Sequence, residues 1–280
     1  MRLRLLVATI CFLLGRNAIA QEIAVFSNSS AAVEHPVVVV EVPTGWSIIG
    51  GGATTNFNDT APGQLLVSSY PLDGNHWIAS STDQVAPYST VLTAYAIAVK
   101  NPSLYDVKIF ASQSVQNEHP SASVSVAGGY VMTGGGAKAD PMIPGQLLVA
   151  SYPSDQSTWA ARSTDHIDPS SGTVTAYAIG IKPLKPNTPA PQIKLFTATS
   201  GATPVAHPRA TVNLDAGFVA TCGGAATGDE SNLLVEDAPV GTLAWTAWSK
   251  DHVYSAPTTI TVYLLGWQNA QRHPLYQQIQ

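Results

Sequence analysis

The chain has 280 residues, of which 45% are hydrophobic and only 11% are charged, and it contains 22 glycines and 20 prolines. This composition is too apolar for a disordered protein, and a formal net charge of −5 excludes a nucleic-acid binder that relies on a basic surface. The low charge also excludes a helical bundle, whose outer faces need lysine and glutamate. What remains is a β-rich globular protein with many glycine and proline turns.

Residues 1–20 have the pattern of a secretory signal peptide. Arg2 and Arg4 form a basic start, residues 5–14 are apolar, and Ala18 and Ala20 place small side chains where a signal peptidase reads them. The apolar segment is too short to span a bilayer, so we expect no membrane insertion. We predict cleavage after Ala20 and a mature protein that is extracellular or periplasmic.

Three residues of the mature chain are candidates for covalent chemistry. Cys222 is the one cysteine that remains after the signal peptide is removed, so an internal disulfide is excluded. We expect Cys222 to be buried and inert, rather than a reactive thiol or a link between chains. Asn28 and Asn58 lie in the N-glycosylation sequons NSS and NDT.

Internal repetition is the strongest signal in the sequence. The phrase GWSIIGGGA at 45–53 returns as GYVMTGGGA at 129–137 and as GFVATCGGA at 217–225. PGQLLVSSYP at 62–71 returns as PGQLLVASYP at 144–153, and its third copy, SNLLVEDAP at 231–239, has diverged. The chain therefore contains three copies of one unit of about 80 residues.

The repeats define the domain boundaries. Repeat 1 occupies residues 21–100, repeat 2 residues 107–182 and repeat 3 residues 192–268. Residues 101–106 form a short linker, whereas residues 183–191 contain four prolines and should form an extended, semi-rigid linker. Residues 269–280 form a polar tail.

Within each repeat the side chains alternate with period two, which indicates strands. In the last strand of repeat 1, Tyr95 and Ile97 share a bulky face, while Ala94, Ala96 and Ala98 share a small one. The other predicted strands of repeat 1 are 23–27, 36–42, 46–51, 64–70 and 76–81. The glycine run lacks the features of a phosphate loop and indicates a bulge or a close approach of two backbones.

We therefore predict an all-β protein. Its three homologous repeats, with six short strands each, are expected to form tandem β-sandwich-like domains. The alternative is one pseudo-three-fold β-prism or barrel.

Each repeat places a tryptophan six residues before an aspartate, with a serine between them. This even spacing puts all three on one side of an unbroken strand, where the indole would stack on a sugar ring and the polar groups would bind its hydroxyls. The competing interpretation is that each tryptophan fills the core of its repeat. The candidate ligand-binding residues are Trp77, Ser81, Asp83, Trp159, Ser163, Asp165, His166, Trp245, Ser249, Asp251 and His252.

Each repeat also contains serine, aspartate and a histidine that precedes proline, namely His35, His119 or His207. We expect no hydrolase, because the chain has no GxSxG elbow and because geometry, not composition, defines a catalytic triad. These histidines and aspartates are predicted to shape turns. No metal-binding spacing occurs, and the loops after the glycine runs lack the dense carboxylates of a calcium site. We expect no enzyme activity, cofactor or metal.

The composite pattern GGGA … PGQLLVASYP … WAARSTDH … GTVTAYAIGI resembles a repeat of uncharacterised secreted β-repeat proteins, mainly bacterial. The resemblance extends through all three repeats and is best in repeat 2. Repeat 3 departs from it at Cys222, Glu236 and Asp237. The resemblance implies secretion and a β fold, and it carries over no catalytic residue.

These observations favour a secreted, non-enzymatic, lectin-like protein that recognises glycans or a cell surface. Three weak sites on one chain gain avidity without any new contact. The alternative is a structural or adhesive extracellular matrix protein that associates through exposed sheet edges. A secreted hydrolase is the second alternative. Nucleic acid is not expected as a partner.

Overall fold

The computed structural model describes residues 21–59, 63–100, 102–143, 145–167, 169–272 and 277–278. The predicted signal peptide, residues 1–20, lies outside the described residues. The part of the chain that is described contains no α-helix, and a single 3-10 turn, Pro102–Leu104, lies between repeats 1 and 2. The predicted all-β fold is confirmed.

Each repeat forms six strands, in agreement with the prediction. Repeat 1 contains β1 (Glu22–Ser29), β2 (Val37–Glu41), β3 (Trp46–Thr54), β4 (Leu65–Pro71), β5 (His76–Thr82) and β6 (Thr93–Lys100). Repeat 2 contains β7 (Tyr105–Gln113), β8 (Ser121–Ser125), β9 (Val131–Asp140), β10 (Leu147–Pro153), β11 (Thr158–Thr164) and β12 (Thr173–Pro183). Repeat 3 contains β13 (Ile193–Thr199), β14 (Arg209–Asn213), β15 (Phe218–Thr227), β16 (Asn232–Val240), β17 (Ala244–Asp251) and β18 (Ile260–Gln268).

Every repeat divides its strands in the same way between two three-stranded antiparallel sheets. In repeat 1 the sheets are β1-β6-β3 and β2-β5-β4. The small face of β6 is fully buried, with Ala94, Ala96 and Ala98 all at 0% exposure. Each repeat is thus a sandwich-like unit, which confirms that part of the prediction.

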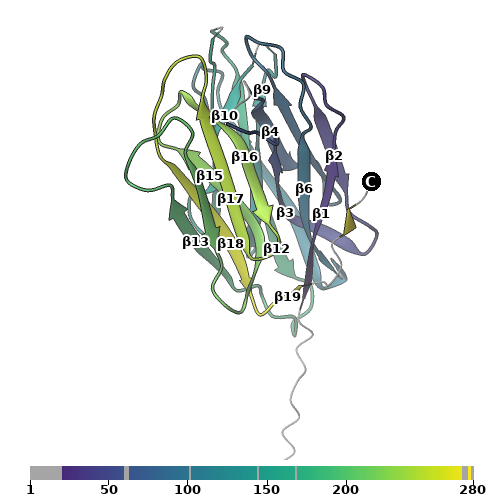
Figure 1. Ribbon diagram of the computed structural model, residues 1–280. Coiled ribbons are helices and arrows are strands. Elements are labelled where there is room, and N and C mark those ends of the chain that lie inside the picture. Colours follow the sequence, from purple (N-terminus) through teal and green to yellow (C-terminus); the bar gives the residue numbers. More distant parts are fainter. Residues whose placement is uncertain are drawn as a thin grey trace, which may run out of the picture.

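Neighbouring repeats join edge to edge into larger sheets. Two residue pairs connect β4 to β9, β10 to β15, and β16 to β3. Since β16 belongs to repeat 3 and β3 to repeat 1, the third unit closes on the first, and these two strands lie side by side in Figure 1. The three sandwich-like units therefore form a closed ring with pseudo-three-fold symmetry, as in the alternative architecture.

Each completed sheet presents one outward face, which we name after the repeats that build it. The 1/2 face belongs to the strand order β2-β5-β4-β9-β12-β7, and the 2/3 face to β8-β11-β10-β15-β18-β13. The 3/1 face belongs to β14-β17-β16-β3-β6-β1. The strands run roughly along the long direction of the molecule (Figure 1).

The segments outside the repeats also take part in the fold. The backbone N–H of Thr188 donates to the carbonyl of Lys185 at 3.0 Å, so the proline-rich linker turns on itself and is not the extended spacer that we predicted. In the polar tail, β19 (Gln271–Arg272) and β20 (Gln277–Gln278) pair in parallel with β1. They extend the edge of the 3/1 sheet.

Gly50, Gly134 and Cys222 occupy equivalent positions and meet where the three repeats converge. The register shifts just before each of them, as expected of a β-bulge. A Cβ atom placed on Gly134 would lie 2.7 Å from the Cβ of Cys222, and one placed on Gly50 would lie 2.5 Å from it. The centre of the ring therefore has room for one side chain.

Cys222 is that side chain. It is fully buried, and its Sγ lies 3.5 Å from the carbonyl oxygens of Gly51, Gly135 and Gly223, one from each repeat. Burial raises the pKa of the thiol to about 12, so it stays protonated at neutral pH. The prediction of a buried, free cysteine is confirmed.

Overfilling the centre should destabilise the ring. We expect Gly134→Ala to lower the free energy of unfolding by about 2–3 kcal/mol, because the new methyl group collides with the carbonyl oxygen of Ile49 and with the side chain of Cys222. Adding Cys222→Gly should restore part of that loss, with a coupling energy of about 1 kcal/mol or more in a double-mutant cycle. Chemical denaturation of the wild type, the two single variants and the double variant measures this coupling energy. Purely additive effects would contradict the inference that Gly134 and Cys222 share one space.

Candidate functional site

The three repeated tryptophans lie in the core. Trp77, Trp159 and Trp245 are 0%, 1% and 0% exposed. Each indole lies against the glycine at the second position of its own run, Gly51, Gly135 or Gly223, where any side chain would overlap the ring. Hence none of the three offers an exposed platform for a sugar, and the core interpretation is the one that the structure favours. Their Nε1 atoms donate to Ser69 Oγ, Ser151 Oγ and Asp237 Oδ1 at 3.1, 3.1 and 2.6 Å.

The serines between tryptophan and aspartate are buried as well. Ser81 donates to Gln64 Oε1 at 2.9 Å, and Ser163 donates to the equivalent Gln146 at 2.8 Å. Gln64 in turn donates to two loop carbonyls. The hydroxyl of Ser249 is buried and has no hydrogen-bond partner within the described part of the chain, although the backbone N–H of Ser249 donates to the carbonyl of Pro208 at 3.1 Å. The hydroxyls of Ser81 and Ser163 therefore hold loops through the glutamines, and all three serines are too buried for a ligand to reach.

The repeated aspartates close turns. One oxygen of each carboxylate accepts the backbone N–H five residues later, and the other oxygen faces the histidine of the His-Pro pair. In repeat 1, Asp83 accepts from Tyr88 at 2.7 Å and lies 3.5 Å from Nδ1 of His35. The equivalent aspartates are Asp165 and Asp251, which accept from Ser170 and Ala256.

His166 and His252 meet at the boundary between repeats 2 and 3. Their ring centroids are 5.0 Å apart, and His166 Nε2 lies 2.8 Å from the backbone oxygen of His252. Burial, and then the neighbouring His166 and Lys250, lower the pKa of His252 to about 4. This histidine is therefore neutral at pH 7 and packs between repeats. The described residues include no group of three or more His, Cys, Asp or Glu side chains placed to hold a metal.

The junction between repeats 3 and 1 differs in chemistry from the other two. Glu236, Asp237 and Ala238 stand where repeat 1 has Ser68, Ser69 and Tyr70. Burial raises the pKa of Asp237 to about 7 from its ordinary value of 3.8, and the hydrogen bond from Trp245 opposes that rise. Burial also raises the pKa of Glu236, opposed by the charge of Arg209 at 3.4 Å.

Asp237 should make the protein less stable as the pH rises. The pKa of Asp237 is higher in the folded than in the unfolded chain, so the folded state is favoured while this carboxyl is protonated. That contribution to stability is complete below pH 3.8 and is lost as the pH rises to about 7. Asp237→Ser copies repeats 1 and 2 and keeps an acceptor for Trp245. The stability gained by Asp237→Ser over the wild type should therefore be greater at pH 8 than at pH 4, by up to about 4 kcal/mol in the free energy of unfolding.

Denaturant titrations of the wild type and Asp237→Ser at both pH values measure this effect. Ser69→Ala, at the equivalent position of repeat 1, is the matched control and should show no such pH dependence. If the free energies of unfolding of Asp237→Ser and the wild type differed by the same amount at both pH values, the raised pKa of Asp237 would be contradicted.

The sequence analysis missed two pairs of outward tyrosines. Tyr70 and Tyr177 stack on the 1/2 face with centroids 4.8 Å apart and planes at 19°. Tyr152 and Tyr263 stack at the equivalent place on the 2/3 face, again at 4.8 Å, with planes at 29°. All four rings are half-buried, and the signal that could have located them was the repeated SYP phrase together with TAY in repeat 2 and TVY in repeat 3.

The third glycine of the run makes this stacking possible. Gly136 lies between Tyr70 and Tyr177 in the cross-strand register, and strands two apart are about 10 Å from each other. Both rings must therefore lean over the glycine to meet. On the 3/1 face the same row holds Ala238, Gly52 and Tyr95, so no pair forms there.

The surroundings of the two pairs differ. Beside Tyr70 and Tyr177, Lys138 and Asp140 form an ion pair of 2.7 Å. Ser123 and Thr197 lie at the two ends of the row through Tyr152 and Tyr263, and both are exposed. Burial and then the neighbouring Tyr70 raise the pKa of Tyr177, so its hydroxyl remains a hydrogen-bond donor.

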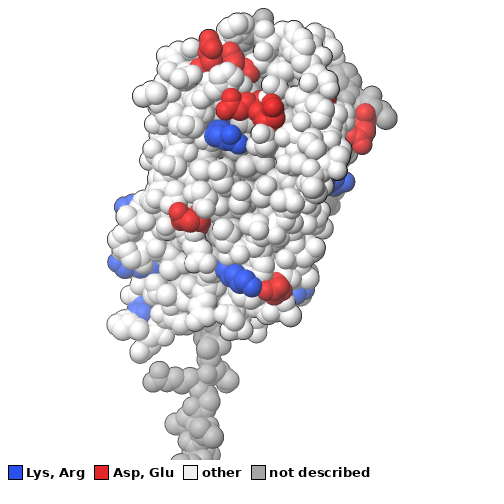
Figure 2. Space-filling view, turned by 90° about the vertical axis from the view of Figure 1, so that its left-hand side faces the viewer, with Lys and Arg blue, Asp and Glu red and all other residues white. Residues whose placement is uncertain are grey.

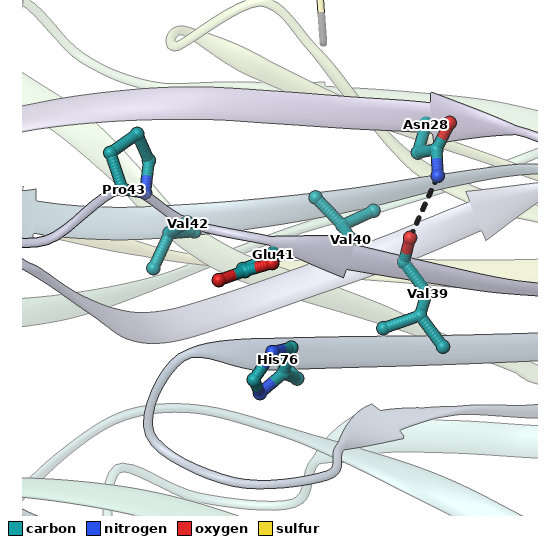
Figure 3. A pocket seen from close by; sticks show the side chains of 7 residues that line it. All are labelled: Asn28, Val39, Val40, Glu41, Val42, Pro43 and His76. Carbon is teal, nitrogen blue, oxygen red and sulfur yellow. Dashed lines mark hydrogen bonds between the residues drawn. The ribbon is translucent and has the colours of Figure 1, made fainter. Parts of the chain in front are cut away.

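An open pocket of about 470 Å³ lies at the edge of the 1/2 face (Figure 3). Its wall comes from β2 and the residues after it, with Asn28 of β1 above and His76 of β5 below. The amide of Asn28, one of the two sequon residues, donates to the carbonyl of Val39 at 2.8 Å. Asn58, the other sequon residue, is exposed.

Compared with protein-family models and with curated proteins, the chain finds no match. Among the described residues, no helix has the length and apolar character needed to cross a membrane. One side of the molecule carries few charged side chains, and most of its acidic groups gather near one end (Figure 2). The tyrosine pairs and the pocket are therefore the features from which a function can be argued.

Proposed function

We propose that the protein is a secreted, non-enzymatic saccharide-binding protein whose binding surfaces are the 1/2 face and the 2/3 face. The observation that carries this proposal is the half-exposed tyrosine pair at equivalent positions of both faces. A tyrosine combines an apolar ring, which packs against the C–H face of a sugar, with a hydroxyl that binds sugar oxygens.

The neighbouring polar groups support the same chemistry. Exposed hydroxyls flank Tyr152 and Tyr263 at Ser123 and Thr197, and an ion pair flanks Tyr70 and Tyr177. Such groups bind hydroxyls directionally without requiring a charged ligand. Two equivalent faces on one rigid ring also allow weak sites to act together on a polymer.

The buried serines argue against the hydrolase alternative. Ser81 and Ser163 donate to glutamine side chains in the core, and neither contacts a histidine. We therefore assign saccharide binding to the tyrosines and no longer to the tryptophans. The proposed class of function, a non-enzymatic lectin-like protein, is the one expected from the sequence.

Binding should depend on the tyrosine pairs. We expect the mature protein to bind in a glycan array and in pull-downs with insoluble polysaccharide. Tyr177→Ala or Tyr263→Ala alone should weaken binding, and the double variant should weaken it at least about tenfold, because both faces lose their stacking ring.

Tyr95→Ala is the matched control, since Tyr95 occupies the equivalent strand position on the face without a pair. It should bind like the wild type, and circular dichroism should show that all variants are folded. An equal loss in the control, or no saccharide binding at all, would contradict the proposal. Light scattering that rises with protein concentration, without saccharide binding, would favour the matrix-protein alternative.

A further inference from the structure

The pocket on the 1/2 face combines an apolar wall with unbalanced negative charge. Val39 and Pro43 supply the exposed apolar lining, whereas Val40 and Val42 are 1% and 2% exposed and lie behind it, and Glu41 lies at the rim (Figure 3). Glu41 is exposed, and no cation pairs with it among the described residues. A carboxylate beside an apolar wall fits a ligand that joins a positive charge to a compact apolar body.

His76 also lies at the rim, but its Nδ1 faces Asp73 and not Glu41. His76 Nδ1 lies 2.8 Å from a carboxylate oxygen of Asp73, so the imidazole is already engaged. Burial alone would raise the pKa of Asp73, but hydrogen bonds from Asn75 and His76 lower it overall. Asp73 is therefore ionised at neutral pH and adds negative charge next to His76, while Glu41 is the carboxylate that lines the pocket itself.

The pocket and the tyrosine pair lie on one continuous row of outward side chains. Val39 pairs with Ile78 across β2 and β5, and Ile78 pairs with Tyr70 across β5 and β4. Alternation along β2 exposes Val39 and Glu41 on the same side. Two strand spacings, about 10 Å, separate the pocket wall from the first stacked ring. A short oligosaccharide laid across the strands would contact both.

The combination of pocket and pair is specific to this face. On the 2/3 face, Ser125 and Thr158 replace Glu41 and His76. On the 3/1 face, Asn213 and Ala244 occupy those positions, and the tyrosine pair is absent. The acidic subsite therefore belongs to repeat 1 alone.

We propose that the 1/2 face selects saccharides that contain a protonated amino sugar. The pocket takes the amino sugar with its ammonium group against Glu41, and the following sugar lies on Tyr70 and Tyr177. This inference rests on the proposed function, and it adds the class of ligand and the residue that selects it. An ammonium–carboxylate pair forms a charge-assisted hydrogen bond, which a neutral acetamido group does not provide.

Two ligands that differ only in this group test the inference. Calorimetry in mildly acidic buffer compares glucosamine oligomers with N-acetylglucosamine oligomers of equal length and linkage. We expect the wild type to bind the amine form about tenfold more tightly. Glu41→Gln should remove that preference while leaving the affinity for the acetylated oligomer unchanged. Ser125→Ala, at the equivalent place on the 2/3 face, should keep the preference.

The outcomes separate the two proposals. Tyr177→Ala should weaken both oligomers on this face, as the proposed function requires. Equal affinity of the wild type for the two oligomers, or a preference that survives Glu41→Gln, would overturn the amino-sugar inference alone. Failure of every saccharide to bind, with the tyrosine variants indistinguishable from the wild type, would overturn the proposed function and this inference together.

Discussion

The space at the centre of the ring is the constraint on which the rest of the structure depends. Three backbones converge there, and they leave room for one side chain, that of Cys222. Gly50 and Gly134 must therefore lack a Cβ for steric reasons, since neither has a positive φ. The next glycine accepts the tryptophan of its own repeat, and the third lies against the strand of the neighbouring repeat. One short glycine run thus determines the centre, the core and the seam between units.

These contacts explain why the buried residues are more alike among the three repeats than the exposed residues are. Residues at the centre and at the seams contact another repeat, so a change in one repeat disturbs the packing of the next. Outward residues face water and can diverge singly. The three faces accordingly share a backbone but differ in their side chains: the 1/2 face has a tyrosine pair with a pocket at its edge, the 2/3 face has a tyrosine pair with exposed hydroxyls, and the 3/1 face has Ala238 in place of one tyrosine.

Much of this fold could be predicted from the sequence because its determinants are local. Alternation located the six strands of each repeat, and the phrase GGGA located the close approach of backbones. The sequence could not decide between tandem domains and the pseudo-three-fold alternative, because each junction depends on only two residue pairs and a strand's own residues do not specify its lateral partner. The tryptophan spacing was compatible with a binding site, but spacing along a strand does not say which face is buried. Only the packing of each indole on a glycine decided that question.

The third junction joins units that no linker holds next to each other in sequence. Repeats 1 and 2, and repeats 2 and 3, are neighbours in the chain, whereas repeat 3 must find repeat 1 across the whole protein. This junction has Asp237 where the others have serine, and next to it Arg209 and Glu236 form an ion pair within repeat 3. Across the junction, His207 Nδ1 lies 3.0 Å from Asp59 of repeat 1, much as His119 lies 3.1 Å from Glu230 across the 2/3 junction. A partner is selected by groups that fit one neighbour and would be left unpaired against another. Glu236 and Asp237 give the 3/1 junction a chemistry that the other two lack, and Ala238, next to them in the strand, removes the first ring of the tyrosine pair. Under the proposed function, binding then falls to the 1/2 and 2/3 faces.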